Sequence, residues 1–385
     1  MELEFTADQD DLRDGVRAML ARECPPTLVR AVVEDSFQAT NEARAAATGL
    51  WDQMVALGWP ALTVPEAHGG LGLGAVELSV VLEELGRVVA PGPFVPTTTQ
   101  LVPAILEAGD DAQQEQFLTA VAAGTCTGAL AVAEIGTGLD PAAVCTTATP
   151  GDNGTWVLSG AKSAVLGATD VDEIVVVARI PGSVGDEGVG AFVVASSALT
   201  IEPVTALDPT RGLGTLRLDD VTVPADRCLG APGPATAAAL RRAIDVAVMG
   251  LAIEAVGTCQ TIFDVTLDYA KQREQFGVPI GSFQAIKHKM ANMLVALERA
   301  RSTGYFAALT IAEDDAGRSL ATSTAKAAAN DCQRLLASEG IQIHGGIGYT
   351  WEHDMHLYVR RVKTDAALFG TTAEHHARIA DLLGV

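Results

Sequence analysis

The sequence predicts an α+β protein in which a β domain lies between two helical regions. Apolar residues recur at helical spacing before about residue 124 and after about residue 231, and short β-branched runs separated by turns fill the stretch between them. The C-terminal patterns are long, apolar and rich in Ala, which indicates a helical bundle that also associates with other subunits. We therefore expect three domains: 1–124, all-α; 125–230, β-barrel-like; and 231–385, a helical bundle.

The first region reads as a series of amphipathic helices. Thr6 is the expected N-cap of a helix over 6–22, and a second apolar pattern over 41–58 ends at Gly58. A Gly-rich turn over 65–74 leads into a third helix, which Pro91-Gly92-Pro93 must end. Two more helical patterns complete the domain, at about 98–109 and 111–123.

The middle region has the alternation and turn chemistry of strands. Turn residues such as Asp152-Asn153-Gly154 and Pro181-Gly182-Ser183 separate the runs. The expected strands contain residues 156–158, 174–177, 191–194, 216–218 and 221–223.

The last region predicts five helices, and the junction of the first two carries the most informative side chains. Gly277 can adopt positive φ and Pro279 cannot continue a helix, so the first helix must end there, while Ser282 is the expected N-cap of the next. An Arg, a Phe and a Gln close together suit a ligand with phosphates and a flat ring, although an ordinary helix–turn–helix with an exposed Arg remains the alternative. The expected helices are 235–271, 283–313, 318–340, about 354–368 and 372–383.

Composition and net charge limit the classes of binding partner that we expect. The formal charge of −22 over 385 residues argues against nucleic acid and anionic membranes, yet a few local Arg residues can still bind a phosphate-bearing cofactor. No uninterrupted apolar run approaches the roughly 20 residues of a membrane helix, and no signal peptide is evident. Six scattered cysteines favour reduced thiols and a cytoplasmic protein. His353 and His356 have no further ligand motif nearby, so we expect no metal.

Several sequence motifs are spread over essentially the whole chain. They are Phe5-Thr6-x-Asp8-Gln9, Val64-Pro65-Glu66 with Gly69-Gly70-Leu71-Gly72, Glu83-Glu84-Leu85-Gly86, Arg273-Glu274-Gln275-Phe276-Gly277-x-Pro279-Ile280 and Gln342-Ile343-His344-Gly345-Gly346-Ile347-Gly348-Tyr349. Together these motifs resemble the acyl-CoA dehydrogenase family. The resemblance implies an N-terminal helical domain, a central β domain and a C-terminal four-helix domain. It also implies FAD-linked oxidation of the Cα–Cβ bond of an acyl-CoA thioester, with a glutamate base and an electron-transfer flavoprotein as acceptor.

In this family one subunit holds the flavin ring and a neighbouring subunit reaches across to the same FAD. The resemblance implies that Thr371 keeps the family's Gly-Thr at the pyrophosphate. The residues that it places on the crossing arm are Arg273, Phe276, Gln284, Gln342, Gly345 and Gly346.

The positions that serve the chain's own flavin depart from the family pattern. Ala133 and Leu166 stand where hydroxyl side chains are usual, and Phe369 and Ala247 stand at the two usual positions of the glutamate base. A phenyl ring or a methyl group cannot accept a proton. The candidate replacements are Asp245 and Glu254, with Glu134 and Glu374 beside the flavin elements; each of the four has a structural interpretation as an ion-pair, helix or capping carboxylate.

Three hypotheses follow. In the leading one the chain is the base-lacking subunit of a heteromeric α2β2 enzyme that acts on steroid-derived CoA thioesters, and it donates FAD contacts in trans. In the second it is an active homomeric acyl-CoA dehydrogenase with a displaced base. In the third it is a redox-inactive binding or scaffold protein with the same fold.

Overall fold

The computed structural model describes residues 5–38 and 42–385, which fall into two compact units. The first unit combines residues 1–43, 75–91 and 248–385, and the second combines 44–74 and 92–247. Helices dominate the first unit, whereas the second contains the sheet. The long helix α8 (Pro234–Gln272) begins in the second unit and continues into the first.

The first unit begins with α1 (Ala7–Glu23), α2 (Pro26–Gln38) and α4 (Ala75–Val88). The expected cap at Thr6 is confirmed: its hydroxyl accepts from the Gln9 amide, and the Gln9 side chain accepts in return from the Thr6 amide. The sequence analysis missed α2. Its signal was Pro26 at the first helical position, where proline's fixed φ and missing donor cost nothing.

The backbones of helices α4 and α8 are in contact at one glycine of each helix. A Cβ on Gly86 would lie 2.0 Å from the carbonyl oxygen of Glu254, and a Cβ on Gly257 would lie 1.8 Å from the carbonyl oxygen of Glu83. The two backbones are therefore in direct contact, and no larger residue fits at either position. This crossing places the acidic pair Glu83 and Glu84 of α4 beside α8.

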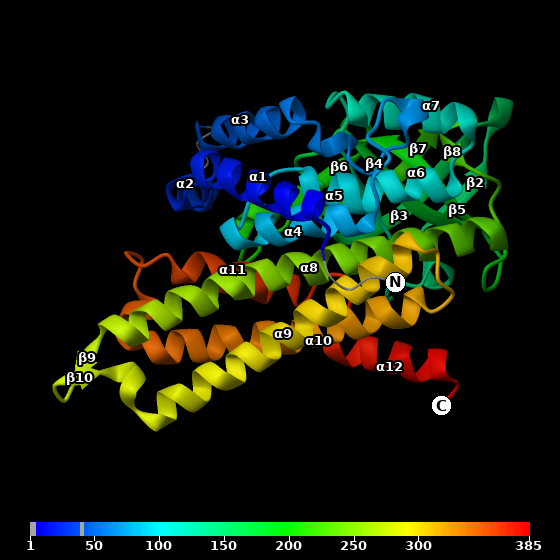
Figure 1. Cartoon of the computed structure of the whole chain (residues 1–385). Helices are drawn as coiled ribbons and strands as arrows, with labels where there is room; N and C mark the ends of the chain where they lie inside the picture. The colour runs from blue at the N-terminus through cyan, green and yellow to red at the C-terminus, as the bar shows by residue number, and fades with distance from the viewer. Residues whose placement is uncertain (1–4, 39–41) are drawn as a thin grey trace. The chain divides into compact units, whose positions relative to one another are not determined.

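The remaining helices of the first unit are α9 (Gln284–Ala312), α10 (Arg318–His344), α11 (Met355–Asp365) and α12 (Thr372–Leu383) (Figure 1). All four were predicted, with ends within four residues. Within the described chain α8 alone is long and apolar enough to cross a membrane, yet 89% of its apolar window is buried, as in a core helix.

The junction of α8 and α9 is a β-hairpin. Strands β9 (Glu274–Gln275) and β10 (Val278–Pro279) pair antiparallel across a two-residue turn. Both turn residues have positive φ, +56° at Phe276 and +78° at Gly277, as in a type I′ turn. The predicted cap at Ser282 is wrong: Phe283 is the N-cap residue, and the Ser282 hydroxyl instead donates to the carbonyl of Pro279 inside a 3₁₀ turn.

In the second unit most of α3 (Glu42–Ala56) and α7 (Asp111–Ala122) match their predicted ranges, and the chain breaks at Pro91-Gly92-Pro93 as expected. The helix expected over 98–109 is less regular. A short turn of helix, α5 (Phe94–Pro96), and a π-helical turn over Thr97–Leu101 precede α6 (Val102–Ala108). Pro103, which has no amide hydrogen to donate, lies within the first turn of α6.

The sheet of the second unit has the order β6-β7-β3-β2-β4-β5-β8, with β1 paired to β4 in parallel. Its inward side chains form one apolar core that includes Leu158, Val176, Phe192 and Leu216. The expected β domain between helical regions is therefore confirmed. The strands are β1 (Gly128–Ala131), β2 (Thr147–Pro150), β3 (Trp156–Val165), β4 (Glu173–Arg179), β5 (Val189–Ala195), β6 (Thr200–Pro203), β7 (Gly214–Val223) and β8 (Cys228–Leu229).

Candidate functional site

The tip of the β9–β10 hairpin presents an aromatic ring to solvent on a strained backbone. Phe276 is 93% exposed, although its φ of +56° is one that side chains other than glycine rarely adopt. Such a conformation costs of order 1–3 kcal/mol and persists where the surroundings enforce it, which is common at binding sites. Arg273, at the base of the hairpin, is exposed and forms no ion pair with any described carboxylate. The Phe276 ring makes an edge-to-face contact with Phe283, at 6.2 Å between centroids, and otherwise faces solvent.

A second exposed element lies at the same end of the first unit, after α10. The ring of Tyr269, near the end of α8, stacks on His344 at 4.5 Å between centroids, which holds the two helix ends together. Gly345 follows with φ +64° and ψ −139°, a conformation that only glycine adopts readily. A Cβ added at Gly345 or Gly346 would meet nothing within 4 Å, so a ligand can approach this backbone closely.

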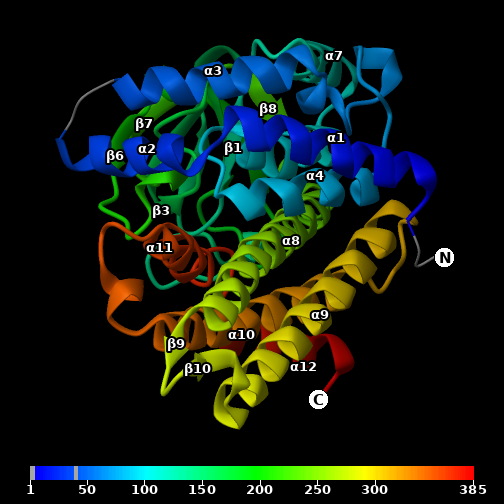
Figure 2. The ribbon, with the colours of Figure 1, turned by 60° about the vertical axis from the view of Figure 1, so that its left-hand side comes forward.

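Six residues predicted for the arm thus divide between these two elements. Gln284 is the exposed first residue of α9, directly after the hairpin, and Gln342 is exposed in the last turn of α10. Both views of the ribbon show the hairpin at the tip of the α8–α9 connection, at the end of the bundle where α10 also ends (Figure 2). A guanidinium, an aromatic face, two carboxamides and an open glycine backbone can together bind a phosphate group and a flat ring.

The loop that follows α11 carries Phe369, which the sequence resemblance places at the position of the expected glutamate base. Phe369 is half-buried, and its φ of +52° is again unusual for a residue with a side chain. His375 donates its Nε2 hydrogen to the Phe369 carbonyl at 2.8 Å, and Asn330 donates to the Gly370 carbonyl at 3.2 Å. These hydrogen bonds hold the loop in a defined shape. The Phe369 side chain within it can neither donate nor accept a proton. Burial lowers the pKa of His375 to about 4, so this histidine is neutral near pH 7.

Thr371 and Glu374 form the cap of α12. The Glu374 amide donates to the Thr371 hydroxyl, and the Glu374 carboxylate accepts from the Thr371 amide at 2.7 Å and from its hydroxyl at 2.8 Å. These hydrogen bonds, the backbone one foremost, lower the pKa of Glu374. The capping geometry accounts for Glu374 without a catalytic role, and it leaves Thr371 exposed at the helix N-terminus.

The candidate base Glu254 is committed to an ion pair. Arg361 of α11 donates to its carboxylate at 2.6 Å, and both side chains are 0% exposed. The same guanidinium donates to the backbone carbonyls of Val89 and Ala90 at 3.3 and 3.2 Å, so the pair ties α8 and α11 to the end of α4. Sequence reasoning did not identify Arg361. The available signal was a cation on the apolar face of its helix, between Tyr358 and Val362.

The other carboxylates named from the sequence are also buried or partnered. Asp245 is 1% exposed and has a polar partner of its own. Glu134 accepts from the buried Lys162 at 2.6 Å and from the amide and hydroxyl of Thr146. Burial alone would raise the pKa of Glu134, but the Lys162 charge and these hydrogen bonds lower it; burial in turn lowers the pKa of Lys162 to about 8. Glu134 therefore stabilises the β domain as an ion-pair carboxylate.

Three replacements remain: Ala133 is half-buried, and the other two are buried. Ala247 is 0% exposed on α8, and Leu166, after β3, is 2% exposed. Neither offers a polar atom on its side chain.

Comparison with known proteins identifies the family. Family models match the chain as acyl-CoA dehydrogenase N-terminal domain over residues 6–125, middle domain over 129–223 and C-terminal domain over 237–384. The acyl-CoA dehydrogenase IpdE2 of Mycobacterium tuberculosis (strain ATCC 25618 / H37Rv) is 33% identical over 94% of this chain and 93% of its own length. The chain belongs to the acyl-CoA dehydrogenase family.

Solved structures of acyl-CoA dehydrogenases agree in fold. A chain of a variant of the Tcur3481-Tcur3483 steroid ACAD superimposes with a TM-score of 0.85 and 32% identity, over 98% of both chains. Butyryl-CoA dehydrogenase from Megasphaera elsdenii superimposes with a TM-score of 0.89 and 26% identity, over the whole of both chains. Acyl-CoA dehydrogenases use FAD, and the exposed guanidinium, aromatic ring and open glycine backbone described above fit its pyrophosphate and flat rings.

Proposed function

We propose that this acyl-CoA dehydrogenase is the base-lacking subunit of a heteromeric enzyme, and that its exposed arm contacts FAD held by the partner subunit. The observation that carries the proposal is the contrast between the exposed arm and the positions expected to hold the base. The arm keeps Arg273, Phe276 and the Gly345-Gly346 backbone exposed, whereas Phe369 and Ala247 occupy the base positions. A subunit that keeps one half of a shared site needs a partner that supplies the other half.

The environment of Glu254 supports the absence of a base. A general base must release its partners to reach substrate, and the Glu254 carboxylate is held 2.6 Å from a fully buried guanidinium. Asp245 remains as a candidate for an active homomer, and it is buried and partnered. Asp245 and Glu254 are the two carboxylates of α8 that the sequence suggested as candidate bases.

The arm residues have distinct proposed roles. Arg273 would hold the pyrophosphate through charge-assisted hydrogen bonds, and Phe276 would cover a ring face. Gln284 and Gln342 would donate or accept at the polar edges of the cofactor, and Gly345 and Gly346 would let their N–H groups approach it. Thr371 would meet the pyrophosphate from the N-terminus of α12. When bound, FAD supplies the acceptor for the hydride that leaves Cβ of the acyl-CoA.

The relatives support a proposed substrate class. The Tcur3481-Tcur3483 protein is described as a steroid ACAD, and its name joins two designations. We infer that this chain likewise works in an α2β2 assembly on a CoA thioester derived from a steroid, with an electron-transfer flavoprotein as the acceptor. The inference rests on 32% identity over nearly the whole chain.

Co-purification with candidate partner subunits tests the proposal. We expect the chain alone to hold little FAD, and the complex to hold FAD and to lose visible flavin absorbance when an acyl-CoA is added without oxygen. Arg273→Gln should weaken FAD binding by the complex at least tenfold, because it removes a charge-assisted contact of about 1.4 kcal/mol or more. Gln275→Ala is the matched control on the same hairpin, since that side chain contacts only the neighbouring Glu274 carbonyl.

Two outcomes would overturn the proposal. One is stoichiometric FAD in the isolated chain together with dehydrogenation of an acyl-CoA, which would favour the homomer; Asp245→Asn would then show whether that carboxylate is the base. The other is an absence of flavin with every partner tested, which would favour a redox-inactive binding protein.

A further inference from the structure

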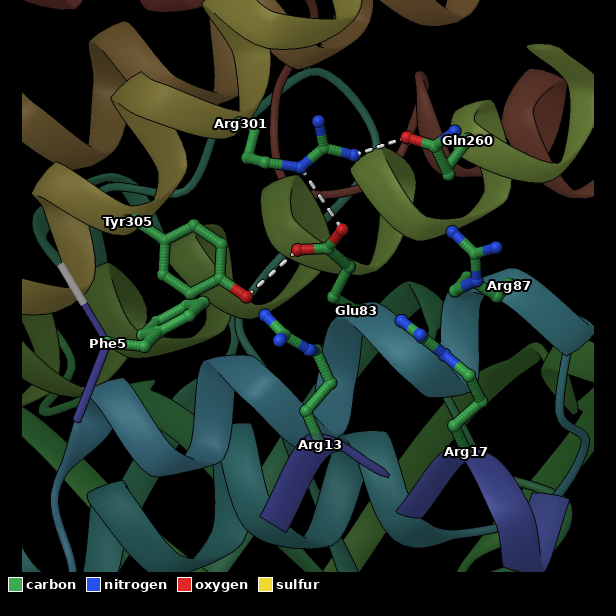
Figure 3. Close-up of a pocket in the computed structure, with 8 residues that line it drawn as sticks. All are labelled: Phe5, Arg13, Arg17, Glu83, Arg87, Gln260, Arg301 and Tyr305. Atoms are coloured by element: carbon green, nitrogen blue, oxygen red, sulfur yellow. Dashed lines mark hydrogen bonds and ion pairs between the residues drawn. The ribbon is translucent and has the colours of Figure 1, made fainter. Parts of the chain in front are cut away.

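A pocket of about 260 Å³ lies in the first unit, away from the arm, and guanidinium groups dominate its lining (Figure 3). Its residues come from the start of α1, from α4, from the middle of α8 and from α9, all within the same compact unit. Four of the eight lining residues are Arg and one is a carboxylate, in a chain whose formal charge is −22. The lining consists of Phe5, Arg13, Arg17, Glu83, Arg87, Gln260, Arg301 and Tyr305.

One of the four Arg side chains, Arg301, is paired with Glu83, the one carboxylate among the lining residues. Arg301 donates to Glu83 at 3.2 Å, and the Tyr305 hydroxyl donates to the other Glu83 oxygen at 2.9 Å. Arg301 also donates to the Gln260 side chain at 2.6 Å and pairs with Glu298. Both oxygens of Glu83 are therefore occupied on one side of the pocket, and the hydroxyl hydrogen of Tyr305 is used (Figure 3).

The other three guanidiniums keep nitrogen atoms that form no hydrogen bond with any described residue, and the Arg13 guanidinium also lies over the Phe5 ring, 5.6 Å from its centroid. Arg17 uses Nε and Nη2 on Glu84, which leaves Nη1. Arg13 uses Nη2 on Asp10, and Arg87 uses Nη2 on Asp264. Figure 3 shows Arg13 and Arg17 rising from the same helix below Glu83, with Arg87 beside Arg17 on the right.

The acids that pair with Arg13 and Arg87 lie at the rim. Asp10 and Asp264 have side chains that are 49% and 43% exposed, so their ion pairs are screened by water and are worth about 0–1 kcal/mol. The side chains of Arg13 and Arg87 are less exposed than those acids, at 32% and 26%. Arg87 is also 3.7 Å from Glu84, which already holds Arg17. The close ion pairs that an incoming anion would compete with for these two cations are therefore exposed and weak, and the buried Glu84 lies farther from Arg87 than Asp264 does.

We propose that this pocket binds a phosphate-class oxyanion, either free phosphate or a phosphate monoester. Three forked cations around one space match the three or more charged oxygens of such a group, and Arg binds phosphate in preference to a singly charged ligand. The volume lies below the roughly 300–1,000 Å³ of clefts that take drug-sized ligands, which suits a small anion. Binding would link α1 and α4, because Arg13 and Arg17 belong to the first and Arg87 to the second.

The test measures inorganic phosphate binding to the full chain by titration calorimetry, at an ionic strength held constant with sodium chloride. We expect the double variant Arg13→Gln/Arg87→Gln to bind phosphate at least tenfold more weakly, while its thermal midpoint without phosphate stays close to that of the wild type because only rim ion pairs are lost. Arg22→Gln, which removes another exposed ion-paired Arg of α1, should bind phosphate normally. AMP, measured in parallel, separates the two sources: tighter binding than phosphate identifies a monoester, and weaker binding identifies free phosphate.

A further control separates this pocket from the arm. Arg273→Gln should leave phosphate binding unchanged, because Arg273 is not part of the pocket. The proposal is wrong if phosphate binds no better than chloride, if the double variant binds phosphate as the wild type does, or if Arg273→Gln alone abolishes binding. The last result would place the ion on the arm, and none of these results depends on whether a partner subunit exists.

Discussion

Arg361→Met is the sharpest probe of the buried ion pair at the base of α11. The substitution keeps an apolar side chain of similar length but removes the guanidinium that lies 2.6 Å from Glu254. Both wild-type side chains are 0% exposed, so the carboxylate stays in a site that water does not reach. Removing one partner of a buried ion pair leaves the other charge without compensation.

The uncompensated charge sets the size of the effect. We expect the free energy of unfolding to fall by about 3–5 kcal/mol, the usual cost of removing one partner of a buried ion pair. The lost hydrogen bonds to Val89 and Ala90 add about 1 kcal/mol each.

Urea unfolding followed by tryptophan fluorescence at pH 7 measures this loss. Arg299→Met is the control, because Arg299 and Asp331 form an exposed pair at 3.6 Å whose loss should cost less than about 1 kcal/mol. A loss in Arg361→Met as small as the loss in Arg299→Met would refute the reasoning, since the buried pair would then contribute no more than an exposed one.

Two other substitutions test the loop at Phe369 and the helix crossing. His375→Gln should keep the hydrogen bond to the Phe369 carbonyl but remove a group with a pKa of about 4 in the folded chain and about 6.5 unfolded. Because the unfolded state binds the extra proton, wild-type stability relative to the variant should fall, by up to about 3 kcal/mol, as pH drops from about 6.5 to about 4 in chemical denaturation; equal slopes would contradict this. Gly86→Ala should destabilise by about 1–3 kcal/mol or more, because its Cβ would lie 2.0 Å from the Glu254 carbonyl oxygen. Gly15→Ala, whose Cβ would meet nothing within 4 Å, should be neutral or stabilising by thermal unfolding, and equal losses in both would mean that the crossing tolerates a side chain.

The sequence by itself determined the order of the helical and β regions and the ends of most C-terminal helices. Those features depend on local periodicity and on stop signals such as the one at Pro279, which act within a few residues. It also determined that Phe369 and Ala247 cannot act as bases, since that depends only on side-chain chemistry. The local rule failed at Ser282, where the hydroxyl bonds back to Pro279 and Phe283 caps the helix instead.

Only the tertiary structure decided which carboxylates are already occupied. Glu254 and Arg361 lie 107 positions apart, so no local pattern reveals that they pair, and Glu134 meets Lys162 only because β3 returns beside its loop. The same holds for the pocket, where Arg13, Arg87 and Arg301 converge from three helices far apart in the chain. The ion-pair partner and the burial of a side chain depend on residues that the whole fold brings together, so only the tertiary structure shows them. Motifs and periodicity depend on neighbouring residues in the chain, so the sequence alone shows them.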